Sequence, residues 1–236
     1  MAKRTIIQKR GKGGPSYASP SHRFFGKLAY PEVKEQTYGE VVDIVNSIGH
    51  SAPLMIVELD NQQMCLIPAP FSIRVGQRIS FGSKDVQIGN VIRLKDAVPG
   101  TIVCNIESNP GDRGKFLRAC GASAQVVTVG SKKVTIKLPS KSKKELNANC
   151  LATVGVVAGS GRKARPMIKA GNKFHARKAR NKLFPIVKGV AMNACNHPHG
   201  GTHRRNLGRP TAIKRGAPAG RKSGSIGARR MGRKKK

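Results

Sequence analysis

The acidic residues of this 236-residue chain are confined to one internal segment. All 11 Asp and Glu lie between Glu32 and Glu145, where 15 Lys and Arg leave a net charge of only +4. Residues 1–31 hold 7 Lys or Arg and residues 146–236 hold 23, without a single acid in either flank. Because like charges repel, such flanks should stay extended until they meet a polyanion. The sequence therefore predicts a folded middle with two basic extensions.

The net charge of +34 needs a polyanionic partner, but it does not by itself identify that partner. An acidic protein or an anionic membrane surface could also neutralise the charge. No apolar run approaches the roughly 18 residues that span a bilayer, and Met1–Arg10 lacks the apolar stretch of a secretory signal. The five Cys are scattered without a CxxC pair, which favours reduced thiols. We expect a cytoplasmic protein with no membrane partner.

The middle segment has the pattern of a mainly β protein. Short runs of β-branched and apolar residues, separated by Gly, Pro or Asn, predict five strands and then four more. The first set covers 41–45, 54–59, 64–67, 78–81 and 90–94, and the second covers 101–106, 125–129, 134–138 and 151–157. Turns are expected at Asp60-Asn61 and at Gly130-Ser131-Lys132. This spacing predicts two tandem small β-barrels that meet near Val98-Pro99-Gly100.

Beyond Gly159 the pattern changes to a short helix that opens near Pro166, because proline suits a first helical turn. Its apolar side would carry Met167, Ala170 and Phe174. Its basic side, which could follow phosphates, would carry Lys169, Lys173, Arg177 and Arg180. Gly171-Asn172 weakens this helix, and a merely solvated charged face is the alternative. No periodicity continues past Pro185.

The segment Gly189–Gly201, with the sequence GVAMNACNHPHGG, resembles the signature of the universal large-subunit ribosomal protein two family. Further stretches resemble the same family's central motifs: Cys104–Glu107 with Pro110-Gly111, Arg118–Gln125, and Leu151–Gly155. The opening Gly11–Gly14 and the short chain are similar to the archaeal type. The resemblance covers nearly the whole sequence.

That resemblance implies a domain arrangement and a function. It implies a basic N-terminal extension at 1–34, an oligonucleotide-binding (OB)-like barrel at 35–98, an SH3-like barrel at 99–160 and a basic C-terminal extension at 161–236. The function implied is that of a structural, non-enzymatic constituent that binds large-subunit rRNA near the peptidyl transferase centre and supports subunit association and tRNA binding. Its expected partners are rRNA, other ribosomal components and, indirectly, tRNA. We expect a monomer within the ribosome, in the cytoplasm, with no cofactor.

Candidate RNA-binding residues concentrate in the signature segment and just after it. Imidazoles can stack on RNA or hydrogen-bond to it, and glycines let the backbone approach phosphate closely. Besides the four cations of the expected helix, the candidates are Met192, Asn193, His197, His199, Gly200, Gly201, Arg204 and Arg205.

Two sharper hypotheses for this segment are disfavoured. His197 could act as a general base, but no Asp or Glu follows Glu145, and Asn196 stands where the bacterial signature has an acidic residue. Cys195, His197, His199 and His203 could bind zinc, but they form one crowded run where structural zinc sites use two separated pairs. We expect neither a catalytic residue nor a metal site.

A generic nucleic-acid condenser is the alternative function. Such a protein needs no tandem folded core, so the predicted strands favour the ribosomal protein. The sequence of the bound RNA distinguishes the two.

Overall fold

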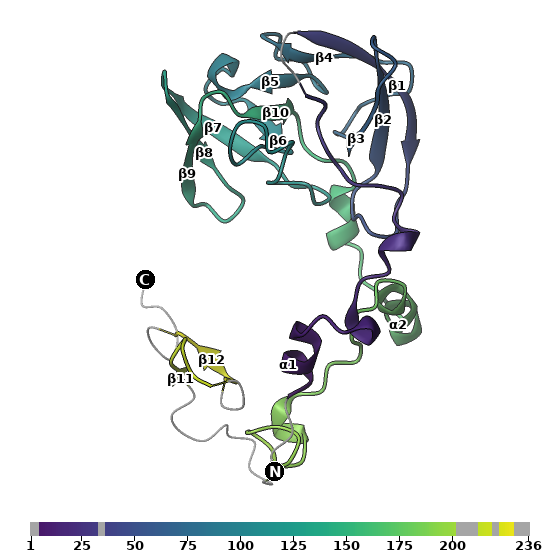
Figure 1. Ribbon diagram of the computed structural model, residues 1–236, viewed down its shortest axis with the longest axis vertical. Helices are drawn as coiled ribbons and strands as arrows, with labels where there is room; N and C mark the ends of the chain where they lie inside the picture. The colour runs from purple at the N-terminus through teal and green to yellow at the C-terminus, as the bar shows by residue number, and fades with distance from the viewer. Residues whose placement is uncertain (1–4, 33–35, 202–211, 219–221, 229–236) are drawn as a thin grey trace. The chain divides into compact units, whose positions relative to one another are not determined.

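The computed structural model describes residues 5–32, 36–201, 212–218 and 222–228, and they divide into two compact units (Figure 1). Residues 21–167 form the first, here called the sheet unit. The described parts of 1–20 and 168–236 form the second, here called the flank unit. The sequence did not predict that the two chain ends belong to one unit.

Ten strands of the sheet unit join in a single ladder, in the order β3-β2-β1-β4-β5-β10-β6-β7-β8-β9. All the pairings are antiparallel except β4 with β5. The bounds are β1 Thr37–Val45, β2 Leu54–Leu59, β3 Met64–Pro68, β4 Arg78–Ser83, β5 Val91–Arg93, β6 Ile102–Cys104, β7 Ala124–Val129, β8 Lys133–Lys137, β9 Lys143–Asn147 and β10 Leu151–Val154. The prediction of a mainly β chain is confirmed.

The hairpin between β2 and β3 forms where the sequence places it. Asn61 holds the turn, because its side-chain Oδ1 accepts the Gln63 N–H at 3.1 Å. The left-handed residue, however, is Gln62 with φ +62°, one position after the predicted pair. The second predicted hairpin also forms, since Gly130 N–H donates to the Lys133 carbonyl at 3.0 Å between β7 and β8.

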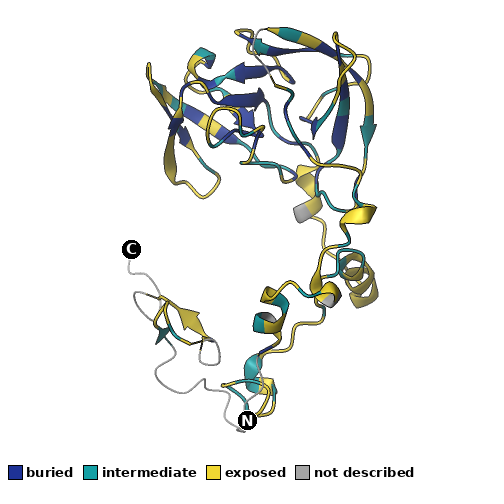
Figure 2. Cartoon of the chain, viewed as in Figure 1, coloured by how far each residue is buried: buried dark blue, intermediate teal, exposed yellow. Residues whose placement is uncertain are grey.

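Two hydrophobic cores share the central strands β5 and β10. Val91 and Leu151 belong to one core, together with side chains of β1–β4. Their chain neighbours Ile92 and Ala152 belong to the other core, together with side chains of β6–β9. Successive side chains of a strand point to opposite faces, so one pair of strands serves both cores. Figure 2 shows buried residues along the strands of both sets.

A buried tyrosine connects the first core to the second set of strands. Tyr30 is 1% exposed, and its hydroxyl donates to the Asn105 carbonyl at 2.7 Å. That leaves the Thr153 hydroxyl to donate to the Tyr30 oxygen at 2.6 Å. Burial raises the pKa of Tyr30 well above its ordinary value, so the ring stays neutral.

The strand pairing differs from two separate tandem barrels. β10 pairs with both β5 and β6, so it joins the two predicted sets of strands, and no pairing among the described strands closes a barrel. Strand β9 was missed because only Leu146 is buried in it and its other side chains are exposed. An edge strand of this kind lacks the apolar run on which the prediction relied.

The flank unit holds short elements: α1 Ile6–Gly11, α2 Ala170–Lys178 and the parallel pair β11 Ala212–Ile213 with β12 Ser225–Ile226. Asn181 links the two ends of the chain, since Arg10 Nη2 donates to its carbonyl at 2.9 Å and its own side chain donates to the Ala18 carbonyl at 2.7 Å. Single turns of 3-10 helix occur in the flank unit at Pro15–Tyr17 and Gly189–Ala191, and in the sheet unit at Ser21–Arg23, Leu94–Asp96 and Ser160–Lys163. Among the described residues, no helix has the length and apolar character needed to cross a bilayer.

Candidate nucleic-acid interface

Helix α2 carries two of the four predicted phosphate-binding cations. Lys173 and Arg177 are four residues apart, so they lie on the same side of the helix. Lys169 is the N-cap residue with extended backbone, and Arg180 follows the helix after its last residue, Lys178. The cations therefore follow one another along the chain, but only two share a regular helical face. Lys173 Nζ also lies 5.3 Å from the centre of the Phe184 ring.

The helix begins at Ala170, four residues after the predicted start. Met167 lies before the helix, in a stretch without regular secondary structure, so the prediction that Met167 shares an apolar helical side is wrong. Pro166 fixes only its own φ and does not oblige the next residues to be helical. No residue of α2 is buried, and Phe174 remains 42% exposed. Burial of its own side chains in a hydrophobic core therefore does not stabilise this helix.

The signature segment 189–201 forms a compact turn that is closed by backbone hydrogen bonds. Asn193 O accepts the N–H groups of Asn196 at 2.9 Å and His197 at 3.2 Å, and Gly201 N–H donates to Met192 O at 3.2 Å. A Cβ at Gly200 would lie 2.2 Å from Met192 O. Only glycine therefore fits at this crossing of the backbone.

His197 and His199 lie together inside this turn. Their ring centres are 4.8 Å apart, and His199 N–H donates to His197 Nδ1 at 3.0 Å. Nδ1 is therefore the acceptor, which places the proton of a neutral ring on Nε2. The His197 ring also fills the space beside Gly189, where a Cβ would lie 2.3 Å from the ring.

The surroundings of His197 favour its neutral form. Partial burial, and then the neighbouring His199, lower the pKa of His197 below its ordinary value. A lowered pKa stabilises the folded turn above the ordinary histidine pKa of about 6.5. That contribution is lost as the pH falls through the lowered value. Protonation would also remove the Nδ1 acceptor, so acid should open the contact with His199.

The remaining predicted residues of this segment are placed in part. Met192 is half-buried and Asn193 is exposed, so both are partly accessible. Arg204 and Arg205 lie outside the described residues. His203, the fourth member of the disfavoured zinc set, also lies outside them. Within the described ranges, no three His, Cys, Asp or Glu side chains gather as metal ligands.

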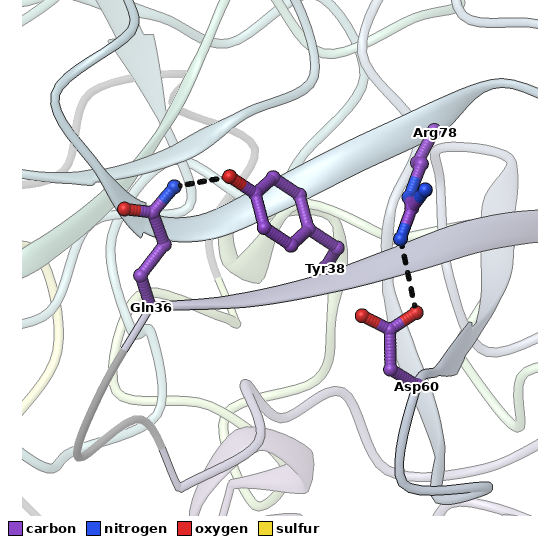
Figure 3. Close-up of polar contacts among 4 residues, drawn as sticks. All are labelled: Gln36, Tyr38, Asp60 and Arg78. Atoms are coloured by element: carbon purple, nitrogen blue, oxygen red, sulfur yellow. Dashed lines mark hydrogen bonds and ion pairs between the residues drawn. The ribbon is translucent and has the colours of Figure 1, made fainter.

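The folded middle also carries charged surfaces that the sequence reasoning overlooked. Figure 3 shows one of them on β1 and β4, where Arg78 ion-pairs with Asp60 at 3.5 Å and Gln36 donates to the Tyr38 hydroxyl at 2.7 Å. The Arg78 guanidinium lies 5.2 Å from the Tyr38 ring centre. This arginine is thus already engaged within the sheet unit.

A second charged surface is the β8–β9 hairpin, which carries several exposed lysines. The signal was present in the sequence as the six lysines between Lys132 and Lys144. The net charge of only +4 over residues 32–145 gives no sign of this local concentration of lysines.

We expect His197→Ala to leave the free energy of unfolding of the sheet unit unchanged within about 0.5 kcal/mol, because both cores lie in residues 21–167. The variant loses the ring beside Gly189 and the acceptor for His199 N–H, so on the role that the sequence resemblance implies, its incorporation into reconstituted large subunits should be impaired. Calorimetry and reconstitution measure the two effects. A purified chain that accelerated peptide transfer without rRNA, and lost this on mutation, would contradict a purely structural role.

Comparison with known proteins gives matches along the whole chain. A family model described as "Ribosomal Proteins L2, C-terminal domain" matches residues 87–220. The large ribosomal subunit protein uL2 of Methanosphaera stadtmanae is 49% identical, and the match covers 100% of both chains. The uL2 proteins of Methanothermobacter thermautotrophicus, at 46% over 100% of both chains, and Halorubrum lacusprofundi, at 44% over 99% of this chain and 98% of its own, are similar. The signature turn, the β sheet and the acid-free flanks thus occur in a chain that belongs to the uL2 family of ribosomal proteins, in its archaeal type.

Proposed function

We propose that this chain is a structural constituent of the large ribosomal subunit and that it binds large-subunit rRNA through its acid-free flanks. Its relatives are named as large-subunit proteins, and their family is a structural component and not an enzyme. On this proposal the chain resides in the cytoplasmic ribosome.

The observation that carries the RNA-binding part is the combination of α2 with the signature turn. Both lie in a segment with no acid after Glu145. Helix α2 buries no residue, and the turn is held by backbone hydrogen bonds and glycines, so neither element has a hydrophobic core that explains it. Lys173 and Arg177 supply charge for phosphates, which position a protein on nucleic acid. The turn supplies imidazoles and close backbone approach.

We assign the RNA contacts to the residues predicted from the sequence. They are Lys169, Lys173, Arg177, Arg180, Met192, Asn193, His197, His199, Gly200, Gly201, Arg204 and Arg205. The contacted RNA is proposed to lie near the peptidyl transferase centre, so that support of tRNA binding and of subunit association is indirect. The chain is proposed to act as a monomer among other ribosomal components.

The two hydrophobic cores support a finer proposal about domains. The core built on β1–β4 would be the OB-like lobe of residues 35–98, and the core built on β6–β9 would be the SH3-like lobe of residues 99–160. The basic extensions would then be residues 1–34 and 161–236. Sharing of β5 and β10 between the cores would join the lobes into one rigid support for the extensions.

Crosslinking followed by sequencing of the bound RNA tests the proposed function. The full chain is incubated with total cellular RNA at physiological salt, with tRNA and small-subunit rRNA present as internal competitors. We expect the crosslinks to gather on a few segments of large-subunit rRNA. Crosslinks spread evenly over all RNAs would instead support a generic nucleic-acid condenser.

A further inference from the structure

The β8–β9 hairpin presents two lysines directly opposite each other. Val134 and Ile136 of β8 and Leu146 of β9 are buried in the second core. Side chains alternate along a strand, so Lys137 and Lys143 lie on the other face, where they are Cα partners in the antiparallel ladder. Both are exposed. Directly opposed like charges destabilise a strand pair, so this arrangement has a cost when the protein is free.

Two other lysines of the same hairpin are already engaged. Lys133 Nζ lies 3.2 Å from a carboxylate oxygen of Glu145, its diagonal neighbour. Lys144 Nζ lies 4.1 Å from the centre of the Phe116 ring, on the side that faces the core. Lys137 and Lys143 have no such partner among the described residues.

The turn that joins the strands adds a third cation. Leu138 N–H donates to the Ser142 carbonyl at 2.9 Å, and Lys141 N–H donates to the Leu138 carbonyl at 2.8 Å. Lys141 is exposed and has φ +66°, a conformation that Gly or Asn would adopt more easily. The hydroxyls of Ser140 and Ser142 lie 2.6 Å apart beside it. Lysines and hydroxyls thus converge at the tip of the hairpin.

We propose that Lys137, Lys141 and Lys143 form a phosphate-binding tip, through which the sheet unit contacts the rRNA backbone separately from the flanks. The proposal rests on the function proposed above. A phosphate group between the opposed ammonium groups relieves their repulsion, which an uncharged partner does not. Lysine is a compact point charge without the planar fork of arginine, so the contact is to the backbone and carries no base specificity.

The test compares two double variants of the full-length chain that lose the same charge. Lys137→Gln/Lys143→Gln removes the opposed pair, and Lys133→Gln/Lys144→Gln removes the two engaged lysines. Binding to an rRNA segment recovered by crosslinking is measured by fluorescence anisotropy from 50 to 400 mM KCl. Each lost phosphate contact lowers the log–log salt slope by about 0.7 to 0.9. We expect the first variant to lose about 1.5 units of slope and at least about tenfold in affinity at 100 mM, and the second to lose much less.

Two further measurements make the result decisive. Without RNA, the first variant should melt at the same or a higher temperature than the wild type, because repulsion is relieved. Glu145→Gln should strengthen RNA binding, because it frees Lys133.

Equal slopes for the two double variants, with wild-type binding intact, would overturn the tip alone. Failure of the wild type to select large-subunit rRNA would overturn the proposed function itself. If the first variant kept its rRNA slope and lost affinity for polyglutamate, the tip would bind acidic protein instead.

Discussion

Raising the salt concentration from about 50 to about 200 mM is expected to weaken binding of the full chain to its rRNA segment by about three orders of magnitude or more. The two flanks together hold 30 Lys and Arg and no acid. Each phosphate that they neutralise releases condensed counterions, and this release becomes less favourable as salt rises. Six to ten such contacts give a loss of about 10³ to 10⁵ over this range.

Equilibrium titrations at several KCl concentrations measure this slope directly. A non-ionic osmolyte at matched osmolality serves as the control and should leave the affinity almost unchanged. A slope equivalent to only one or two phosphates would be incompatible with two basic flanks that clasp RNA. The function would then depend on a few local contacts, such as those of the signature turn.

The second large effect concerns Glu107, the one carboxylate that is buried among the described residues. Its oxygens accept N–H groups from Arg113 at 2.8 Å, Leu151 at 2.9 Å and Gly111 at 3.4 Å. It thereby fixes the loop after β6 to the first residue of β10. Glu107→Ala would leave the buried N–H of Leu151 and the partly buried N–H groups of Arg113 and Gly111 without this acceptor. We expect a loss of about 3 to 5 kcal/mol of stability, because each hydrogen bond to a charged group contributes about 1.5 to 3.

Urea denaturation followed by circular dichroism measures this loss. Glu107→Gln keeps one oxygen acceptor and should lose distinctly less, while Glu58→Ala, an exposed change on β2, should stay within about 0.5 kcal/mol. If Glu107→Ala and Glu58→Ala were equally stable, the hydrogen bonds of Glu107 would not be what holds the loop to β10.

Local patterns predicted most of the strands. β2 matches the prediction at both ends, and β3, β7 and β8 match within one residue, because buried β-branched and apolar residues mark them plainly. The pairing of β10 with both β5 and β6 was not predictable in the same way, since β10 lies 46 or more residues after the end of either strand. Register between distant strands depends on packing that no local window contains. The parallel pair β11–β12 was missed for the same reason, and each of its strands has only two residues to mark it.

The candidate site was predictable in its composition and less so in its geometry. At Gly200-Gly201 the backbone passes too close to its neighbours for a side chain, while the predicted approach to phosphate stays a prediction. Only two of the four predicted cations share one side of the helix. The backbone of Lys169 is extended, and Arg180 lies beyond the last residue of α2. Their contacts with RNA remain predictions. The lysine tip needed the strand register, since Lys137 and Lys143 become opposed only once the hairpin is paired.

The sharing of β5 and β10 has a consequence for how the chain is made. Val91 and Leu151 complete one core while Ile92 and Ala152 complete the other, so neither core is closed until β10 is in place. During synthesis on a ribosome, both half-built cores would stay open until Val154 has left the exit tunnel. Strands β1 to β9 would expose apolar surface to the cytosol for all of that time, and long-range pairing of this kind is slow and prone to aggregation. Both cores of the sheet unit would then close in one late step, when the four residues of β10 become available for pairing.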